Sequence, residues 1–284
     1  MQLKELYSLG KDNLSRSAIE TPGLEAYLLL SESDVIDDLS EIYAHPEREV
    51  AQDTAIKFQE LLERRVNREP IAYIIGEKEF YSKTYLVNPG VLIPRPETEL
   101  LVDETLELTR QIEGSLFILE IGTGSGCIAV TLASYCDRAK IVASDISQRA
   151  LDIAKVNLTK HGQNDRITLT KADMLSTFKN NCFDIIVSNP PYITESEFRL
   201  LDPEVKKYEP KLALTGGENG LFYINKIISD SKRILKNGGW CVLEIGYDQR
   251  EEVENIFIDC GFTDISSTKD LNGIERVIKA KWKK

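Results

Sequence analysis

The four residues Asn189-Pro190-Pro191-Tyr192 combine groups that could bind a planar amide or exocyclic amine. They follow the apolar run 183–188, so we expect them where a buried strand ends. Two prolines stiffen such a loop and remove two N–H donors, which leaves oxygen atoms as acceptors. An NH2 group could donate to the side-chain oxygen of Asn189 and to the carbonyl of Pro190, while the Tyr192 ring covers its flat face. The alternative is an ordinary Pro-Pro turn.

A glycine-rich turn, Gly122-Thr123-Gly124-Ser125-Gly126, is the second candidate site. It lies between the apolar run 116–121 and a helix-like stretch, an arrangement typical of the first βα unit of a nucleotide-binding sheet. Such glycines let a ligand approach bare backbone, and the helix start offers unpaired N–H groups. The spacing differs from that of dinucleotide folds, and the Glu120 carboxylate would repel a pyrophosphate. A cationic ligand such as S-adenosylmethionine fits better, although a glycine turn also occurs as mere packing.

Two further acidic residues end later predicted strands. Asp145 lies about 20 residues beyond the glycines, where a carboxylate can accept hydrogen bonds from both ribose hydroxyls. It could also cap the helix that begins near Gln148. Asp173 would accept from the adenine amino group, and Met174 would pack on the ring unless it fills a gap in the core.

The glycine turn, Asp145 and the Asn-Pro-Pro-Tyr sequence, in that order along the chain, resemble the motifs of a class I methyltransferase that modifies an amide or amino nitrogen. Further stretches make the chain similar to the HemK/PrmC family over essentially its whole length: Arg64-Arg65 with Glu69 to Gly76, Leu92 to Glu99, and Tyr208-Glu209-Pro210 continuing to Leu221. Pro96 to Glu99 favour the release-factor branch over the sister family that acts on a large-subunit ribosomal protein. Met174 departs from the family pattern, because relatives often carry an aromatic or larger apolar residue there.

The resemblance implies transfer of a methyl group from S-adenosylmethionine to N5 of the glutamine in the Gly-Gly-Gln motif of peptide chain release factors. Leu92 and residues 95–99 would wall the glutamine pocket or brace the glycine turn, and a structural linker is the alternative for Arg95, Thr98 and Glu99. The expected catalytic residues are Asn189, Pro190 and Tyr192. The expected cofactor-binding residues are Glu120, Gly122, Thr123, Gly124, Ser125, Gly126, Asp145, Asp173, Met174 and Asn189. The expected substrate-binding residues are Asn189, Pro190, Pro191, Tyr192, Leu92 and Arg95.

The composition of the chain limits the possible cell compartments, bound groups and substrate classes. The chain has 284 residues, 42% of them hydrophobic, and its start shows no secretory pattern, so we expect a cytoplasmic protein without membrane association. Five cysteines without Cys-x-x-Cys spacing and only two histidines give little support for disulfides or a metal site. A net charge of −11 favours a basic protein substrate over a phosphate backbone, and we expect a monomer that forms no stable nucleic-acid complex.

The pattern predicts two domains that position these sites. Residues 1–76 read as a helical domain for substrate docking, and residues 77–90 as a β-hairpin linker, with the strand pattern beginning at Tyr73. Residues 91–284 read as an α/β methyltransferase domain, a Rossmann-like doubly wound sheet. Its last strand, 276–281, should be antiparallel because only a short turn precedes it.

Two other functions use the same residues. An amino-methyltransferase could hold a flipped base, through adenine N6 or guanine N2, in the same cradle. A binding protein could keep the cofactor fold without catalysis.

Overall fold

The computed structural model describes residues 1–284, and contacts divide the chain into two units. The helical unit contains residues 1–77 and 202–208, and the sheet unit contains residues 78–201 and 209–284. No helix in either unit combines the length and the apolar character needed to cross a membrane.

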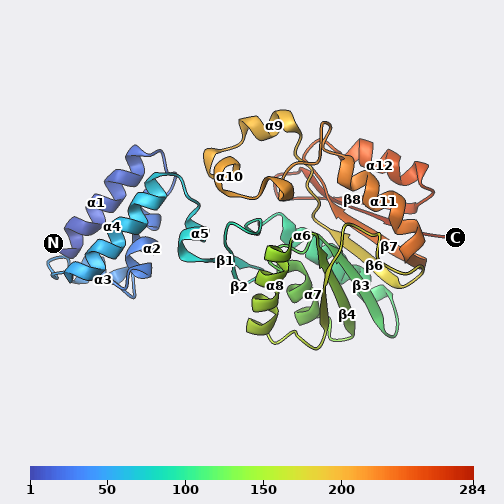
Figure 1. Cartoon of the computed structure of the whole chain (residues 1–284), viewed down its shortest axis with the longest axis horizontal. Helices are drawn as coiled ribbons and strands as arrows, with labels where there is room; N and C mark the ends of the chain where they lie inside the picture. The colour runs from blue at the N-terminus through green and yellow to red at the C-terminus, as the bar shows by residue number, and fades with distance from the viewer. The chain divides into compact units, whose positions relative to one another are not determined.

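The helical unit packs α1 (Leu3–Arg16), α2 (Pro22–Glu32), α3 (Ser40–Ala44) and α4 (Gln52–Val66) around one apolar core (Figure 1). In α1, Leu3, Leu6 and Leu14 are buried along one face at helical spacing. Gly10 lies on the same face, where a Cβ would come within 2.8 Å of the Phe58 ring of α4. A glycine is therefore needed for α1 and α4 to approach this closely.

The predicted strand beginning at Tyr73 is wrong, because residues Ile71–Ile75 form a short helix, α5. Pro70 precedes this helix, and Gly76 ends it in the left-handed conformation with φ of 82°. The hairpin begins afterwards, with β1 (Glu77–Phe80) paired to β2 (Lys83–Leu86). One helical turn bounded by proline and glycine overrides the apolar pattern that suggested a strand.

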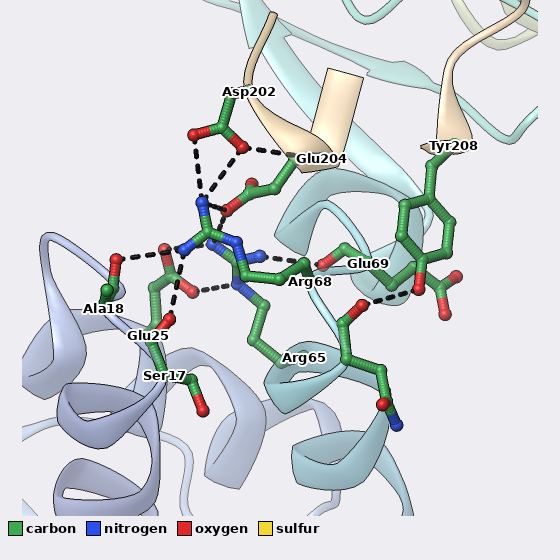
Figure 2. A network of polar contacts seen from close by, with 10 residues as sticks. Ser17, Ala18, Glu25, Arg65, Arg68, Glu69, Asp202, Glu204 and Tyr208 are labelled. Atoms are coloured by element: carbon green, nitrogen blue, oxygen red, sulfur yellow. Dashed lines mark hydrogen bonds and ion pairs between the residues drawn. The ribbon is translucent and has the colours of Figure 1, made fainter. Parts of the chain in front are cut away.

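Residues 202–208, which include α10 (Pro203–Tyr208), belong to the helical unit although they are distant in sequence. Figure 2 shows the ion cluster that holds them: Arg65 Nη2 donates to Glu204 Oε1 at 2.9 Å, and Arg65 also pairs with Glu25. Arg68 Nη2 donates to both carboxylate oxygens of Asp202, at 2.9 and 3.0 Å. Arg65 is only 3% exposed, so the charges of the Arg65 cluster are largely removed from water.

The sheet unit contains seven strands in the order β5-β4-β3-β6-β7-β9-β8. The strands are β3 (Leu116–Ile121), β4 (Ala139–Asp145), β5 (Ile167–Lys171), β6 (Phe183–Ser188), β7 (Leu235–Glu244), β8 (Thr263–Lys269) and β9 (Glu275–Lys281). Strands β3 to β7 are parallel, and β9 pairs antiparallel with both β7 and β8. The predicted doubly wound sheet with an antiparallel final strand is confirmed.

Both faces of the sheet are covered by helices (Figure 1). Ile118 of β3 joins the apolar cluster formed with α6 (Thr98–Gln111), α7 (Cys127–Tyr135) and α8 (Gln148–Lys160). The next residue, Leu119, joins the opposite cluster with α11 (Phe222–Ile234) and α12 (Arg250–Asp259). Successive side chains point to opposite faces of a strand, which explains why the strands are apolar throughout. The connection from β6 to α11 carries α9 (Glu195–Leu200) and a 3₁₀ turn (Lys211–Ala213).

Candidate active site

A pocket lies at the carboxyl ends of β3, β4 and β6, in the middle of the sheet. Strand β3 lies between β4 and β6. The chain therefore continues from β3 to one edge of the sheet through β4 and β5, and then to the other edge through β6 and β7. α/β sheets bind their ligands at the point where the strand order reverses in this way. The expected site residues that line the pocket are Leu92, Gly122, Gly124, Asp145, Asp173, Met174, Asn189, Pro190 and Pro191. Lining residues that sequence reasoning missed include Val91, Pro210, Leu212, Ala213, Tyr223 and Ile227.

The three glycines of the turn have different surroundings. Gly122 and Gly124 line the pocket with φ of 72° and 53°, and a Cβ on either would meet nothing within 4 Å. They therefore present bare backbone to the pocket. Gly126, with φ of 81°, is the N-cap residue of α7, and a Cβ there would lie 3.2 Å from the Cβ of Ala154. Gly126 thus serves the packing of α7 on α8.

Glu120 is a completely buried acid beside this pocket. Its Oε2 accepts a hydrogen bond from the Thr123 hydroxyl at 2.7 Å, while its Oε1 has no partner. Burial raises the pKa of Glu120 to about 8, the Thr123 hydroxyl acts in the opposite direction, and the negative charge of Asp145 raises it further. A buried carboxylate with an unpartnered oxygen can stabilise a cation, so these residues fit a ligand that carries positive charge.

Asp145 holds the turn in place from the end of β4. Its Oδ2 accepts from the backbone N–H of Gly124 at 2.9 Å, and its Oδ1 accepts from that of Ser147, also at 2.9 Å. Ser147 caps α8, since its hydroxyl accepts from Ala150 N, so the alternative in which Asp145 caps this helix is wrong. Each carboxylate oxygen can accept a second hydrogen bond from a ligand in the pocket.

Asp173 and Met174 come shortly after β5, and both line the pocket. Met174 adopts φ of 52°, a conformation that is uncommon for residues other than glycine. Its side chain also packs against the apolar cluster around α11. The two interpretations of Met174, pocket wall and core filling, therefore both describe its position.

The Asn-Pro-Pro-Tyr loop is fixed by side chains from two distant elements. Asn189 Nδ2 donates to the Thr98 hydroxyl at the start of α6, at 3.1 Å, which leaves Oδ1 as the acceptor of this side chain. The Tyr192 hydroxyl donates to Glu244 Oε1 at the end of β7, at 3.2 Å. The Tyr192 ring packs against the cluster around α11 and is not among the residues that line the pocket.

A glycine-rich segment, residues 214–220, contacts the backbone of this loop and is called the return segment. Ile193 N donates to Leu214 O at 3.0 Å, and Gly216 N donates to Ile193 O at 2.9 Å. A Cβ on Gly216 would lie 2.5 Å from the carbonyl oxygen of Pro191, and one on Gly220 would lie 2.2 Å from that of Tyr192. Only glycine allows this approach, which gives a physical reason for the two glycines.

Residues 92–99 do not share one role. Leu92 lines the pocket, whereas Arg95 Nη2 pairs with Glu209 Oε1 at 2.5 Å. The second oxygen of Glu209 accepts from Ile93 N at 3.2 Å. Glu99 accepts from Tyr81 N in the β1–β2 turn at 2.7 Å. Of the expected residues, Arg95, Glu120, Thr123, Ser125, Gly126 and Tyr192 lie outside the pocket lining.

Comparisons with known proteins identify the family. Residues 5–76 match the PrmC N-terminal domain, and residues 97–203 match the Methyltransferase small domain. A release factor glutamine methyltransferase of Koribacter versatilis is 40% identical over 98% of both chains. The chain belongs to the family of release factor glutamine methyltransferases. A second member, from Clostridium botulinum, is 38% identical over 99% of both chains.

As a release factor glutamine methyltransferase family member, the protein is a methyltransferase whose cofactor is S-adenosylmethionine. A solved structure of a methyltransferase from Pyrococcus furiosus aligns with this protein over 78% of this chain and 98% of the Pyrococcus chain, with a TM-score of 0.53 and 17% sequence identity. That likeness concerns the fold alone.

Proposed function

We propose that this protein methylates N5 of the glutamine side chain in the Gly-Gly-Gln motif of peptide chain release factors. The observation that carries the proposal is the position of Asn189 in the pocket. Its Nδ2 is bonded to Thr98, so its Oδ1 remains to accept, beside the carbonyl of Pro190. Relatives across the whole chain are named release factor glutamine methyltransferases. Release factors act on ribosomes, so we place the reaction in the cytoplasm.

The cofactor would lie along the carboxyl ends of β3 to β5. Glu120 would stabilise its positive charge, while the backbone of Gly122 to Gly126 would surround it. Asp145 would accept from the ribose hydroxyls, and Asp173 from the adenine amino group, with Met174 against the ring. The unpartnered Oε1 of Glu120 and the bare backbone at Gly122 and Gly124 support this placement. When bound, S-adenosylmethionine supplies an electrophilic methyl group.

The protein residues have to make a poor nucleophile react. The nitrogen lone pair of an amide is delocalised, so the NH2 group must be held in line with the methyl carbon and allowed to become pyramidal. Asn189 Oδ1 and the Pro190 carbonyl would accept its two hydrogens. Positive charge develops on the nitrogen as the new N–C bond forms and the S–C bond breaks, and fixed oxygens stabilise this state more than the neutral ground state. The methylated amide then releases a proton to water, so no general base is required.

A glutamine in a Gly-Gly-Gln loop suits a recessed pocket because two glycines leave no neighbouring Cβ to obstruct the approach. The helical unit contributes no residue to the pocket, and we propose that it binds the release factor away from the glutamine. Hydrogen exchange would test this docking role, with slower exchange expected in α1 to α4 when a release factor and a cofactor analogue are present. Unchanged exchange there, together with protection of the pocket, would exclude it.

A methyl-transfer assay in which each candidate acceptor is tested separately identifies the substrate. Wild-type enzyme and cofactor are incubated with a release factor, a release factor whose glutamine is replaced, a large-subunit ribosomal protein, DNA and ribosomal RNA. Mass spectrometry then locates the added methyl group, which we expect only on the glutamine of the unmodified release factor. Methylation confined to a nucleic acid or to the ribosomal protein would reject the proposal, and no transfer to any acceptor would favour a binding protein.

Replacing Asn189 separates chemistry from cofactor binding. We expect Asn189→Ala to lower kcat by about a hundredfold, because one fixed transition-state contact is lost. The dissociation constant of S-adenosylmethionine should change far less, which calorimetry can measure. Normal turnover in a folded variant would show that the loop is only a turn.

A further inference from the structure

Gln249 is a buried glutamine that joins the Asn-Pro-Pro-Tyr loop to the connection between β7 and α12. It is the N-cap residue of α12, and it is 8% exposed. Its Nε2 donates to the carbonyl oxygen of Tyr192 at 3.1 Å, and its Oε1 accepts from Gly246 N at 2.9 Å. Each end of the Gln249 amide therefore has a polar partner.

Both partners of this amide belong to the backbone, and they determine its orientation. The N–H group of Gly246 can only donate, and the carbonyl of Tyr192 can only accept. A rotated Gln249 amide would place NH2 against N–H and oxygen against oxygen. The two ends of a glutamine amide have nearly the same shape, so the hydrogen bonds, and not packing, select between them. Only a side chain with one donor and one acceptor at this spacing satisfies both backbone groups.

Glycines on two sides bring the backbone close to the Gln249 amide. A Cβ on Gly220 of the return segment would lie 2.2 Å from the carbonyl oxygen of Tyr192 and 2.7 Å from Gln249 Nε2. A Cβ on Gly246 would lie 3.0 Å from Gln249 Oε1. The amide, the loop and the return segment are therefore in close contact at one point.

The Asn-Pro-Pro-Tyr loop depends on donors from other elements because its prolines cannot donate. Pro190 and Pro191 lack backbone N–H groups, so this stretch has to be held through its carbonyls and its side chains. Gln249 binds the Tyr192 carbonyl, and Glu244 binds the Tyr192 hydroxyl. The two proline rings also fix φ at consecutive residues. A displacement of Tyr192 is therefore passed on towards the pocket instead of being absorbed within the loop.

We propose that Gln249 is a positioning residue, which holds the Tyr192 backbone so that the Pro190 carbonyl and Asn189 Oδ1 face the substrate NH2 group. The inference deepens the proposed function and rests on it, because these two oxygens are the proposed acceptors. Gln249 is not among the residues that line the pocket. It acts on turnover through the loop and makes no contact with the cofactor or the glutamine.

Gln249→Glu tests the donor alone. The carboxylate has nearly the same shape and keeps an oxygen for Gly246 N, but its other oxygen would face the Tyr192 carbonyl and repel it. Gln249→Met removes both hydrogen bonds and keeps a side chain of similar length. Gln163→Glu is the matched control, because Gln163 is 7% exposed and lies between α8 and β5, outside the pocket lining. Its Oε1 accepts from Arg166 Nη2 at 2.7 Å, so a carboxylate has a cationic partner there.

Four quantities are measured in the full-length enzyme: kcat and KM on a release factor, the dissociation constant of S-adenosylmethionine, and Tm. We expect both Gln249 variants to lower kcat by about tenfold to a hundredfold, because a displacement of about 1 Å in an active site can cost on the order of a hundredfold. KM and the dissociation constant should stay within about threefold of wild type, since the lost contact acts mainly in the transition state. Gln163→Glu should match the wild type in kcat, KM and cofactor binding.

Wild-type kcat in folded Gln249→Glu would overturn the positioning role while leaving the proposed function intact. It would also be overturned if kcat fell only in proportion to the fraction of chains that bind cofactor, because that is the result of a purely structural role. If Gln249→Glu does not fold, a folded Gln249→Met with normal kcat is sufficient to reject the positioning role, and failure of both variants to fold would assign Gln249 to stability alone. If the wild type transfers no methyl group to a release factor, the proposed function has failed, and the positioning role fails with it.

Discussion

We expect the Glu120 carboxyl to have a cost for stability and a role in cofactor binding. Its folded-state pKa of about 8 lies above the ordinary value of 4.5 because the carboxyl is buried, so the folded protein binds this proton more tightly than the unfolded chain. The protonated Glu120 carboxyl therefore stabilises the folded protein, relative to the ionised form, below the ordinary pKa of 4.5, and this stabilisation is lost as pH rises towards 8. A cation bound at Oε1 would offset that loss.

Glu120→Gln should separate the two effects. Without cofactor, the variant should melt at a higher temperature than wild type at about pH 9 and at a similar temperature at about pH 5, since only the wild type then changes its ionisation. The stabilisation gained on adding S-adenosylmethionine should be smaller in the variant. Calorimetric scans with and without cofactor test both statements, and equal gains in the two proteins would contradict the role of Glu120 as partner of the positive charge.

Asp145 is expected to matter through the ribose and through the glycine turn. Asp145→Ala removes up to two ligand hydrogen bonds to an ionised acceptor, each worth about 1.5 to 3 kcal/mol, and frees the N–H groups of Gly124 and Ser147. Cofactor affinity should fall by at least about tenfold. Titration calorimetry measures this, with Asp152→Ala as control because Asp152 is exposed on α8. Unchanged affinity in folded Asp145→Ala would rule out the ribose contact.

At the scale of elements, the close contact of the return segment with the Asn-Pro-Pro-Tyr loop predicts a graded effect of glycine substitutions. Gly220→Ala would place a Cβ 2.2 Å from the Tyr192 carbonyl oxygen at φ of 72°. Gly273→Ala has the same conformational problem at φ of 80°, but its Cβ would meet nothing within 4 Å. The left-handed conformation alone costs about 1 to 2 kcal/mol, so Gly273→Ala measures that term.

We expect Gly220→Ala to lose more stability than Gly273→Ala in urea unfolding, and to lower kcat because the loop that carries Asn189 must move. Gly273→Ala should leave kcat at the wild-type value. A Gly220→Ala enzyme with the stability of Gly273→Ala and normal turnover would show that the two segments are not tightly fitted.

The elements of the sheet could be predicted because their patterns are local. Apolar strands alternate with amphipathic helices, and the short turn at Leu271-Asn272-Gly273 required the last two strands to be antiparallel. Residues 73–75 were assigned wrongly to a strand because one short helical turn of five residues, Ile71–Ile75, is too short to distinguish from a strand by its pattern.

Residues brought to the site from elsewhere in the chain could not be predicted from local patterns. Asn189 and the glycines were found because their motifs are contiguous. Thr98 was recognised as part of Pro-Glu-Thr-Glu, but its hydrogen bond with Asn189 depends on how α6 meets the end of β6. Glu244 lies in an apolar strand where nothing in the sequence indicates its partner Tyr192.

At the scale of the whole molecule, the charges around Arg65 are expected to hold residues 202–208 in the helical unit. The side chains of Arg65, Glu25 and Glu204 are 4%, 10% and 22% exposed. Arg65→Met would leave the buried carboxylate of Glu25 without its partner and Glu204 with Arg68 alone, which should lower the free energy of unfolding by about 3 to 5 kcal/mol. Arg64→Met is the matched control, because Arg64 pairs with Glu69 while 42% exposed, and such pairs contribute about 0 to 1 kcal/mol.

Chemical denaturation of both variants, followed by circular dichroism, measures the difference between these neighbouring arginines. If separate transitions are resolved, the loss should affect the transition of the helical unit. Equal small losses in the two variants would show that the ion cluster is dispensable.

The inclusion of residues 202–208 in the helical unit also has a consequence for biosynthesis and for fragment design. A growing polypeptide contains Glu25 and Arg65 early, but Glu204 is added only after the glycine turn and the Asn-Pro-Pro-Tyr loop have been translated. The helical unit is therefore not covalently complete until Tyr208 has been added. A fragment that ends at residue 77 lacks acidic partners of both Arg65 and Arg68, and a faithful excised version would have to graft residues 202–208 back onto it.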